Sequence, residues 1–412
     1  MEHQPIDSAE FKFPDTALPE DDASRETRRD RPAMEYGELS AEEKEKMAEL
    51  ERQFANPQLV EINTPEVEGE RMNIEYVVLD VRTDEEKDQA AKNNEHTVVH
   101  IPGYGSSLRS PDAFAKLLAL REKKRVIVMS QPSTGKSDPA PKKWLKFSRD
   151  ERSFAPFAES LSRAVDAIRT NEAQSGSSLT TEELSVVSSS MGSIIAAEMA
   201  KAHPKKVKDL VLLHPGGINE ENVLQLAVRY LPETFGSKIA TKLRKPLTDQ
   251  QMDEMGKAFQ ETFGKSLQQT FEEAGGQGEF SLQDATQQET DMYRAVTQDI
   301  MKDSAANTAR GKYREGLRLL LWEALTIAKG GMQRTLKDIK ANTYVVFGGE
   351  DGLFPADQMS KAKEALQDNP NVRAEILPTV HDEIYQRPRD YTGRVGTFLD
   401  DMRKLEASSG RA

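Results

Sequence analysis

The pattern of hydrophobic and polar positions predicts alternating strands and helices over most of the chain. Short runs rich in β-branched residues, bounded by polar segments, are typical of buried strands. Such runs lie at residues 97–101, 125–129, 184–189, 207–213, 344–347 and 372–377. Between several of them, apolar residues recur at the spacing of one helical face. Strands that alternate with helices indicate an α/β fold with a mostly parallel central sheet and helices on both faces.

The first 56 residues form an N-terminal extension to this pattern. Residues 1–38 are polar and charged, with few large apolar side chains, and we expect them to be disordered or only loosely attached. Ser40 and Glu43 have the spacing of a helix capping box. The apolar residues that follow fall on one helical face, which predicts a short amphipathic helix.

The sheet is expected to begin with residues 59–62 and 74–79. These two runs are separated by a turn-like segment, which favours an antiparallel pair. A charged loop is expected at about residues 82–95, where apolar residues are scarce.

The alternation stops between residues 216 and 336, where only helical patterns occur. It resumes afterwards with a strand at residues 344–347 and ends with an amphipathic helix. Four segments are therefore predicted. They are the extension at 1–56, the first part of the α/β core at 57–215, an all-helical insertion at 216–336, and the second part of the core at 337–412.

Composition narrows the possible functions. The chain of 412 residues has no cysteine and a formal net charge of -13. Disulfides and a thiol nucleophile are excluded, and the negative charge argues against nucleic acid as a partner. No run approaches the roughly 20 apolar residues that span a bilayer, and no signal peptide is visible. We expect no association with a membrane and a cytoplasmic location.

One pentapeptide, Ser188-Ser189-Ser190-Met191-Gly192, joins a buried strand to a helix. A sharp turn of this kind requires small residues two positions before and after its apex, and here they are Ser188 and Gly192. Ser190 at the apex would lie above the sheet edge, and the helix N-terminus and the Met191 N–H would favour a developing negative charge. The alternative is a serine-rich strand end without a chemical role.

This pentapeptide resembles the nucleophile elbow G-x-S-x-G of the α/β-hydrolases, with Ser188 in place of the first glycine. In that family the acid and the histidine follow the serine, in that order. The resemblance implies that Asp351, after the strand at 344–347, is the acid. It also implies that His381, after the last strand, is the base.

Alternatives to these two assignments exist. Asp351 precedes a glycine and could be an ordinary turn residue, and His381 could belong to a surface loop. Glu350 and Asp382 are neighbouring acids that could replace Asp351. His203 and His214 also follow Ser190, but only His381 follows the last predicted strand.

The resemblance also implies a second donor for an oxyanion. The segment Pro102-Gly103-Tyr104-Gly105 is similar to the family's H-G-x-G loop, with proline in the position of the histidine. Tyr104 would then donate its backbone N–H alongside that of Met191, and the two glycines would let the backbone approach a substrate closely. The alternative is a simple Pro-Gly turn.

Two other motifs have less support. Residues 130–137 nearly match the phosphate-binding pattern G-x-x-x-x-G-K-[ST]. The first glycine is replaced by Ser130, however, and prolines follow where the helix of a P-loop would begin. A family loop ending in G-x-S-D fits residues 135–138 better. His96 and His100 are close in sequence but lack a third metal ligand, so neither a metal nor another cofactor is expected.

The resemblance as a whole implies a serine hydrolase with a helical cap. Its reaction would be acyl transfer to water from a small carboxylic ester or a related acyl compound. Ser188, Ser193 and Pro102 depart from the family pattern. The alternative is therefore a protein of the same fold that binds a ligand or a partner without turnover.

Overall fold

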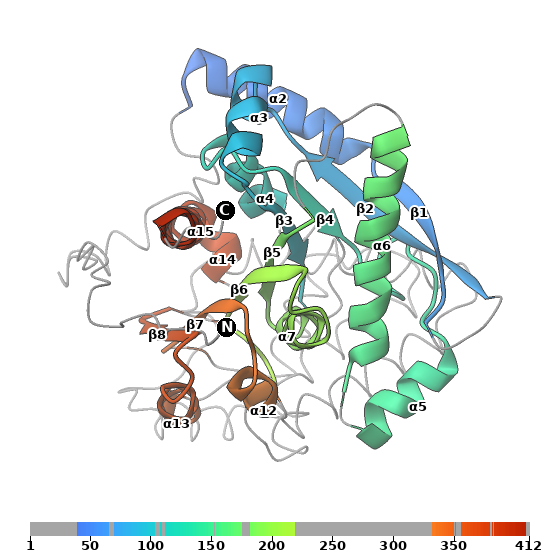
Figure 1. The fold of residues 1–412 in the computed structure, drawn as a ribbon, viewed down its shortest axis with the longest axis vertical. Helices are drawn as coiled ribbons and strands as arrows, with labels where there is room; N and C mark the ends of the chain where they lie inside the picture. The colour runs from blue at the N-terminus through green and yellow to red at the C-terminus, as the bar shows by residue number, and fades with distance from the viewer. Residues whose placement is uncertain are drawn as a thin grey trace, which may run out of the picture.

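An eight-stranded sheet forms the centre of the protein in a computed structural model (Figure 1). The structure describes residues 39–65, 70–103, 108, 112–151, 153–174, 182–218, 332–349, 351, 356–379, 381 and 383–408. The strands follow the spatial order β1-β2-β4-β3-β5-β6-β7-β8. They are β1 (Gln58–Asn63), β2 (Arg71–Leu79), β3 (Thr97–Ile101), β4 (Val126–Met129), β5 (Leu184–Ser189), β6 (Val207–Leu213), β7 (Asn342–Gly348) and β8 (Val372–Leu377).

The sheet is mostly parallel, as the sequence predicts. β1 pairs antiparallel with β2, and β2 pairs antiparallel with β4. All remaining neighbours, from β4 through β3 to β8, are parallel. Because parallel strands end at the same edge, the segments that follow β3, β5, β7 and β8 are brought to one side of the molecule.

Helices cover both faces of this sheet (Figure 1). α6, α7, α12 and α13 contribute to the core on one face, and α2, α4 and α15 contribute to it on the other. The helices are α2 (Ala41–Ala55), α3 (Asp84–Lys92), α4 (Asp112–Leu120), α5 (Lys142–Glu151), α6 (Ala155–Gln174), α7 (Gly192–Ala202), α12 (Met332–Lys337), α13 (Ala356–Leu366), α14 (Glu383–Gln386) and α15 (Pro388–Ser408). The predicted class, with helices on both faces of the sheet, is confirmed.

The helix expected in the N-terminal extension is present as α2. Ser40 accepts a hydrogen bond from the Glu43 N–H, and the Glu43 carboxylate accepts one from the Ser40 N–H. Met47, Leu50 and Phe54 are buried on its inner face. Residues 1–38 lie outside the described part of the chain.

The prediction of a charged loop at residues 82–95 is wrong, because helix α3 occupies most of this segment. Thr83 and Glu86 form a second capping box at its start. Ala90 is the one side chain that α3 buries, so the segment lacks the apolar stripe by which helices are recognised. The Thr83/Glu86 spacing was the available signal.

Residues 219–331, most of the predicted helical insertion, lie outside the described residues. α12, which falls almost entirely within the interval 216–336, packs against α7 and α13. Its Met332 and Leu336 are buried in the same core cluster as the sheet. The remainder of the insertion stays a prediction.

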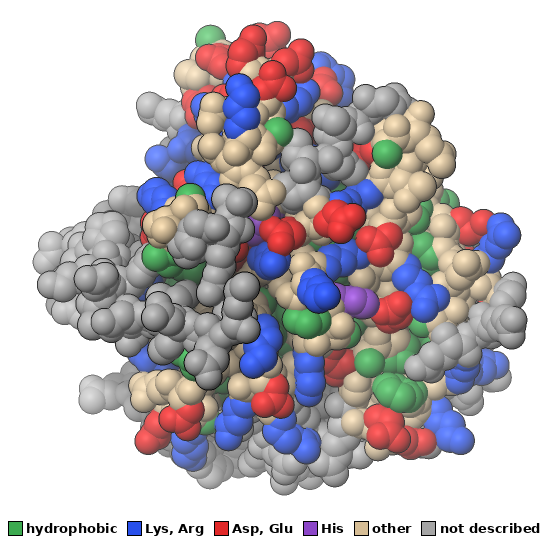
Figure 2. Space-filling view, in the orientation of Figure 1, with side chains coloured by type: hydrophobic (Ala, Val, Ile, Leu, Met, Phe, Trp, Pro, Cys, Tyr) green, Lys and Arg blue, Asp and Glu red, His purple; other side chains and the backbone are tan. Residues whose placement is uncertain are grey.

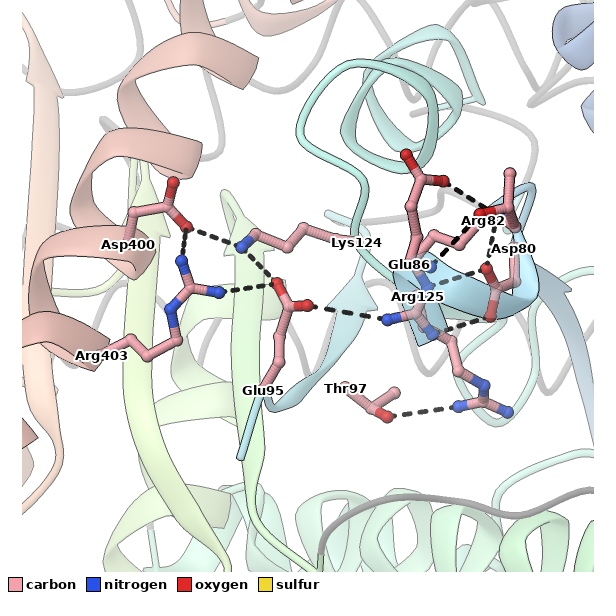
Figure 3. A network of polar contacts seen from close by, with 10 residues as sticks. Asp80, Arg82, Glu86, Glu95, Thr97, Lys124, Arg125, Asp400 and Arg403 are labelled. Carbon is pink, nitrogen blue, oxygen red and sulfur yellow. Dashed lines mark hydrogen bonds and ion pairs between the residues drawn. The ribbon is translucent and has the colours of Figure 1, made fainter. Parts of the chain in front are cut away.

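A network of ion pairs joins α15 to the segments that precede β3 and β4 (Figure 3). The Lys124 ammonium lies 2.5 Å from Glu95 and 2.8 Å from Asp400 of α15. Arg403 of α15 contacts the same two carboxylates. Arg82 approaches Glu95 from the other side, at 3.7 Å. The Lys124 and Glu95 side chains are 5% and 11% exposed, so their pair is shielded from water, whereas the Asp400 side chain is 39% exposed.

On the face drawn in Figure 2, acidic and basic side chains are interspersed across the described surface. The formal net charge of -13 is therefore not gathered into one acidic patch on this face. Among the described helices, none is both long and apolar enough to cross a membrane.

Candidate active site

The predicted elbow has the backbone geometry of a strained strand-to-helix turn. β5 ends at Ser189, and α7 begins at Gly192. Ser190 between them has φ of 50°, a left-handed conformation that few residues other than glycine adopt. The Ser190 N–H donates to the Leu213 carbonyl at 3.0 Å, and its carbonyl accepts from the Gly216 N–H at 3.1 Å. The end of β6 therefore holds Ser190 in this conformation on both sides.

The small residues around Ser190 are required by neighbouring backbone. A Cβ atom on Gly192 would lie 2.3 Å from the Pro102 carbonyl oxygen and 2.6 Å from that of Ile101. Ser188 occupies the position of the family's first glycine, and its hydroxyl lies 3.4 Å from Ser193 Oγ and 3.3 Å from the Val211 carbonyl. These two serine departures from the family pattern therefore contact each other inside the fold.

The structure brings Ser190, His381 and Asp351 into one hydrogen-bonded chain. His381 Nε2 lies 2.9 Å from Ser190 Oγ, and His381 Nδ1 lies 2.7 Å from Asp351 Oδ2. An ionised carboxylate only accepts hydrogen bonds, so Nδ1 carries the ring proton and Nε2 presents its lone pair to the serine. The Asp351 side chain is fully buried and that of His381 is 9% exposed.

The order of strands explains this convergence. Ser190 follows β5, Asp351 follows β7 and His381 follows β8, and all three strands end at one edge of the sheet. Glu350 and Asp382, the alternative acids, lie outside the described residues.

The predicted oxyanion site is described in part. Met191 precedes the first helical residue of α7, and no hydrogen bond from its N–H to an acceptor occurs in the part of the chain that the structure covers. Gly103 lies directly against the nucleophile, since a Cβ atom there would be 3.0 Å from Ser190 Cβ and 3.6 Å from Ser190 Oγ. Tyr104 and Gly105 lie outside the described residues, so their role stays a prediction.

A second histidine lies beside His381. His214 follows β6, and its ring centroid is 6.1 Å from that of His381. His214 Nε2 lies 2.6 Å from the Tyr391 hydroxyl, which is in turn 3.2 Å from Thr379 Oγ1 on the segment leading to His381. Burial lowers the pKa of His214 to about 3, and the charges of His381 (lowering) and Asp351 (raising) act less strongly. His214 is therefore a neutral ring beside His381.

From its place in the sequence, His214 is only an alternative to His381 as the base. Its contact with Tyr391 of α15 crosses 177 positions of sequence, and no local pattern indicates it. The available signal was a histidine directly after an apolar strand, where a buried side chain is expected.

The phosphate-loop-like segment and the two histidines His96 and His100 contact other parts of the fold. In the phosphate-loop-like segment, the Lys136 N–H donates to the buried carboxylate of Glu75 at 2.9 Å, and helix α5 begins only at Lys142. His96 Nδ1 lies 3.0 Å from Asp209 Oδ2. His100 is fully buried against the ring of Phe114. Within the described residues, no group of three or more histidine or acidic side chains has the arrangement of a metal site.

Comparisons with known proteins agree with this fold. A family model described as alpha/beta hydrolase fold matches residues 96–382. Among solved structures, a hydrolase from Pseudomonas aeruginosa PA01 has a TM-score of 0.50 at 15% identity, covering 83% of this chain and 98% of its own. A candidate lipase from Acinetobacter baumannii AYE has a TM-score of 0.52 at 15% identity, covering 90% of this chain and 99% of its own. No curated protein sequence matches.

At these identities, the solved structures support the fold alone. The family match spans the elbow, the acid loop and the histidine, and it covers well over half of the chain. The chain therefore belongs to the α/β-hydrolase fold family.

Proposed function

We propose that the protein is a serine hydrolase that transfers an acyl group from a carboxylic ester or a related acyl compound to water. The observation that carries this proposal is the hydrogen-bonded chain from Ser190 Oγ through the His381 ring to Asp351. A serine hydroxyl becomes an effective nucleophile when a base is positioned to take its proton and a third group orients that base.

The reaction would proceed in two halves. Ser190 Oγ attacks the acyl carbonyl carbon while its proton moves to His381 Nε2, which then protonates the departing alcohol. A water molecule then attacks the carbonyl carbon of the acyl-enzyme while its proton moves to His381 Nε2. His381 returns this proton to Ser190 Oγ as the acid leaves. Asp351 stabilises the positive charge on the His381 ring in both halves.

The negative oxygen formed in each half would need N–H donors. The Met191 N–H at the start of α7 is one, and the dipole of α7 adds to its effect. Tyr104 is proposed as the second donor from the sequence pattern alone. Because Gly103 lies against Ser190, the oxygen of a substrate attacked by Ser190 would lie near this loop.

The rival interpretation is a ligand- or partner-binding protein without turnover. The departures from the family pattern at Ser188, Ser193 and Pro102 favour it. The contact between the two serine hydroxyls reduces the weight of the first two, because the Ser188 hydroxyl has hydrogen-bond partners within the elbow. Catalysis also accounts for the alignment of His381 with Ser190, which simple binding does not require.

The proposal is tested by hydrolysis of p-nitrophenyl esters with acyl chains from acetyl to octanoyl. We expect turnover by the wild-type protein and a loss of about a thousandfold or more in Ser190→Ala. Ser189→Ala is the matched control, because the buried Ser189 precedes the apex, and it is expected to keep most of the activity. Equal rates in wild type and Ser190→Ala would contradict the proposal.

A further inference from the structure

Two residues that follow β4 reach across to the segment that follows β3. The Gln131 side-chain amide donates to the Pro102 carbonyl at 2.5 Å. The Ser130 hydroxyl oxygen accepts from the Leu108 N–H at 3.1 Å. Ser130 and Gln131 are 0% and 1% exposed, so these hydrogen bonds face little competition from water. Both ends of the segment 102–108 are therefore attached to the same two neighbouring residues.

A buried carboxylate fixes the direction of one of these hydrogen bonds. The Ser130 hydroxyl donates to Glu75 Oε2 at 2.8 Å, and the Lys136 N–H donates to the same oxygen at 2.9 Å. A hydroxyl has one proton. With that proton on the Glu75 side, the Ser130 oxygen is left to accept from Leu108. Glu75, which is 2% exposed, thus orients Ser130 toward the segment.

The first residues of this segment, Pro102 and Gly103, lie close to the nucleophile Ser190. Gly103 lies against Ser190, and the Pro102 carbonyl is enclosed between the Gln131 amide and the backbone of Gly192. The peptide bond between Pro102 and Gly103 is planar and trans, so its N–H points opposite to its carbonyl. A hydrogen bond that fixes the Pro102 carbonyl therefore also fixes the direction of the Gly103 N–H and the start of the next peptide unit.

We propose that Gln131 and Ser130, with Glu75 behind them, are positioning residues for the oxyanion site. They hold Pro102 and Leu108 in place, and with Pro102 the Gly103 N–H, beside Ser190, where the negative oxygen forms when Ser190 attacks. The proposal rests on the proposed hydrolase function. It gives a role to the first two residues of the sequence that resembles a phosphate loop, since Ser130 and Gln131 contact the segment that follows β3.

The first test is Gln131→Glu, which preserves the shape of the side chain and replaces its donor with an acceptor. Removal of an oxyanion donor costs about a hundredfold to a thousandfold in kcat. Displacement of the segment should cost less, so we expect kcat on p-nitrophenyl acetate to fall about 10- to 100-fold with KM changed by less than about twofold.

The second readout is the affinity of an alkyl trifluoromethyl ketone, which forms a tetrahedral adduct with an active serine. If Gln131 positions the oxyanion site, the affinity of this mimic falls in Gln131→Glu by about the same factor as kcat/KM. A structural effect confined to stability would lower the melting temperature and leave the affinity for the mimic unchanged.

Ser130 provides an independent pair of variants. Ser130→Ala removes both hydrogen bonds of the hydroxyl and should lower kcat and the affinity for the mimic together. Ser130→Thr keeps the hydroxyl and should restore both measurements toward wild type. This pair decides the question if Gln131→Glu does not fold.

Two outcomes would overturn the positioning role. One is wild-type kcat in Gln131→Glu and Ser130→Ala, measured on an active wild-type protein. The other is a loss of kcat in these variants without any loss of affinity for the mimic. Failure of the proposed function is distinguishable, because the wild-type protein would then neither hydrolyse the ester nor bind the trifluoromethyl ketone.

Discussion

His381 Nε2 lies 2.9 Å from Ser190 Oγ, although 191 positions separate the two residues in the sequence. The contact depends on the parallel sheet, because β5 and β8 deliver their following segments to the same edge. It also depends on the left-handed conformation of Ser190, which raises its side chain out of the strand.

Replacement of His381 tests its role as the base. In His381→Ala, Ser190 loses its proton acceptor, and we expect turnover of an activated ester to fall by about four orders of magnitude. Asp351→Asn removes the charge that orients and stabilises the ring. We expect it to leave about tenfold to a hundredfold more turnover than His381→Ala does. Turnover is measured at saturating ester, with circular dichroism as the control for folding. Activity near wild type in a folded His381→Ala would show that another group serves as the base.

Gly192 and Gly393 provide a matched pair of glycine substitutions. In Gly192→Ala the new Cβ would meet two backbone carbonyl oxygens at 2.3 and 2.6 Å, so the elbow must shift and both activity and stability should fall. In Gly393→Ala, within α15, the new Cβ meets nothing within 4 Å. Alanine is favoured over glycine inside a helix by about 0.5–1 kcal/mol, so this variant should be more stable. Urea unfolding measures both, and an unperturbed Gly192→Ala would refute the close approach of Pro102.

His96 is expected to make stability depend on pH. Burial lowers the pKa of His96, but the hydrogen bond and charge of Asp209, with the nearby charges of Glu406 and Glu183, outweigh burial and raise the pKa above its usual value. The protonated ring therefore stabilises the fold fully below about pH 6.5, the usual pKa of an unfolded histidine, and this stabilisation is lost as pH rises through the folded-state value.

The comparison of wild type with His96→Gln isolates this effect. Wild type should exceed His96→Gln in free energy of unfolding by more at pH 6 than at pH 9, as measured by urea denaturation at each pH. A difference that grows with pH would mean that the neutral form of His96 is the stabilising one.

The ion-pair network around Lys124 should contribute to stability. Lys124→Met removes the ammonium that Glu95 and Asp400 share, whereas Arg403 still contacts both carboxylates. Loss of one partner of a fully buried pair costs about 3–5 kcal/mol. Because Arg403 remains and the Asp400 side chain is 39% exposed, we expect a smaller decrease of about 1–2 kcal/mol in the free energy of unfolding. Lys87→Met is the control, since the Lys87 and Asp84 side chains are 47% and 97% exposed and such pairs contribute about 0–1 kcal/mol. Equal effects of the two substitutions would show that burial of the network is unimportant.

The sequence predicted those parts of the fold that have a strong local pattern. The β-branched runs specified the parallel strands, and the small residues around Ser190 specified the elbow. α3 was missed because it buries only Ala90 and therefore has almost no apolar face. α5 was not predicted either, although Pro141 directly before its first residue is a common start signal.

The site was predictable to the extent that strand ends determine it. Asp351 and His381 could be placed because each follows a strand that is recognisable in the sequence. The attachments formed by Gln131, Glu75 and His214 could not be predicted, since they join residues far apart in the chain through side chains that also suit ordinary loops and strands. Such contacts depend on the packing of the whole sheet.

Covalent labelling with a fluorophosphonate probe tests the central claim most directly. The account predicts that the wild-type protein gains one adduct by intact mass, that peptide mapping places it on Ser190, and that labelling is lost in Ser190→Ala but retained in Ser189→Ala. Labelling that persists in Ser190→Ala, or no labelling of a folded wild-type protein, would contradict the claim that Ser190 is an activated nucleophile.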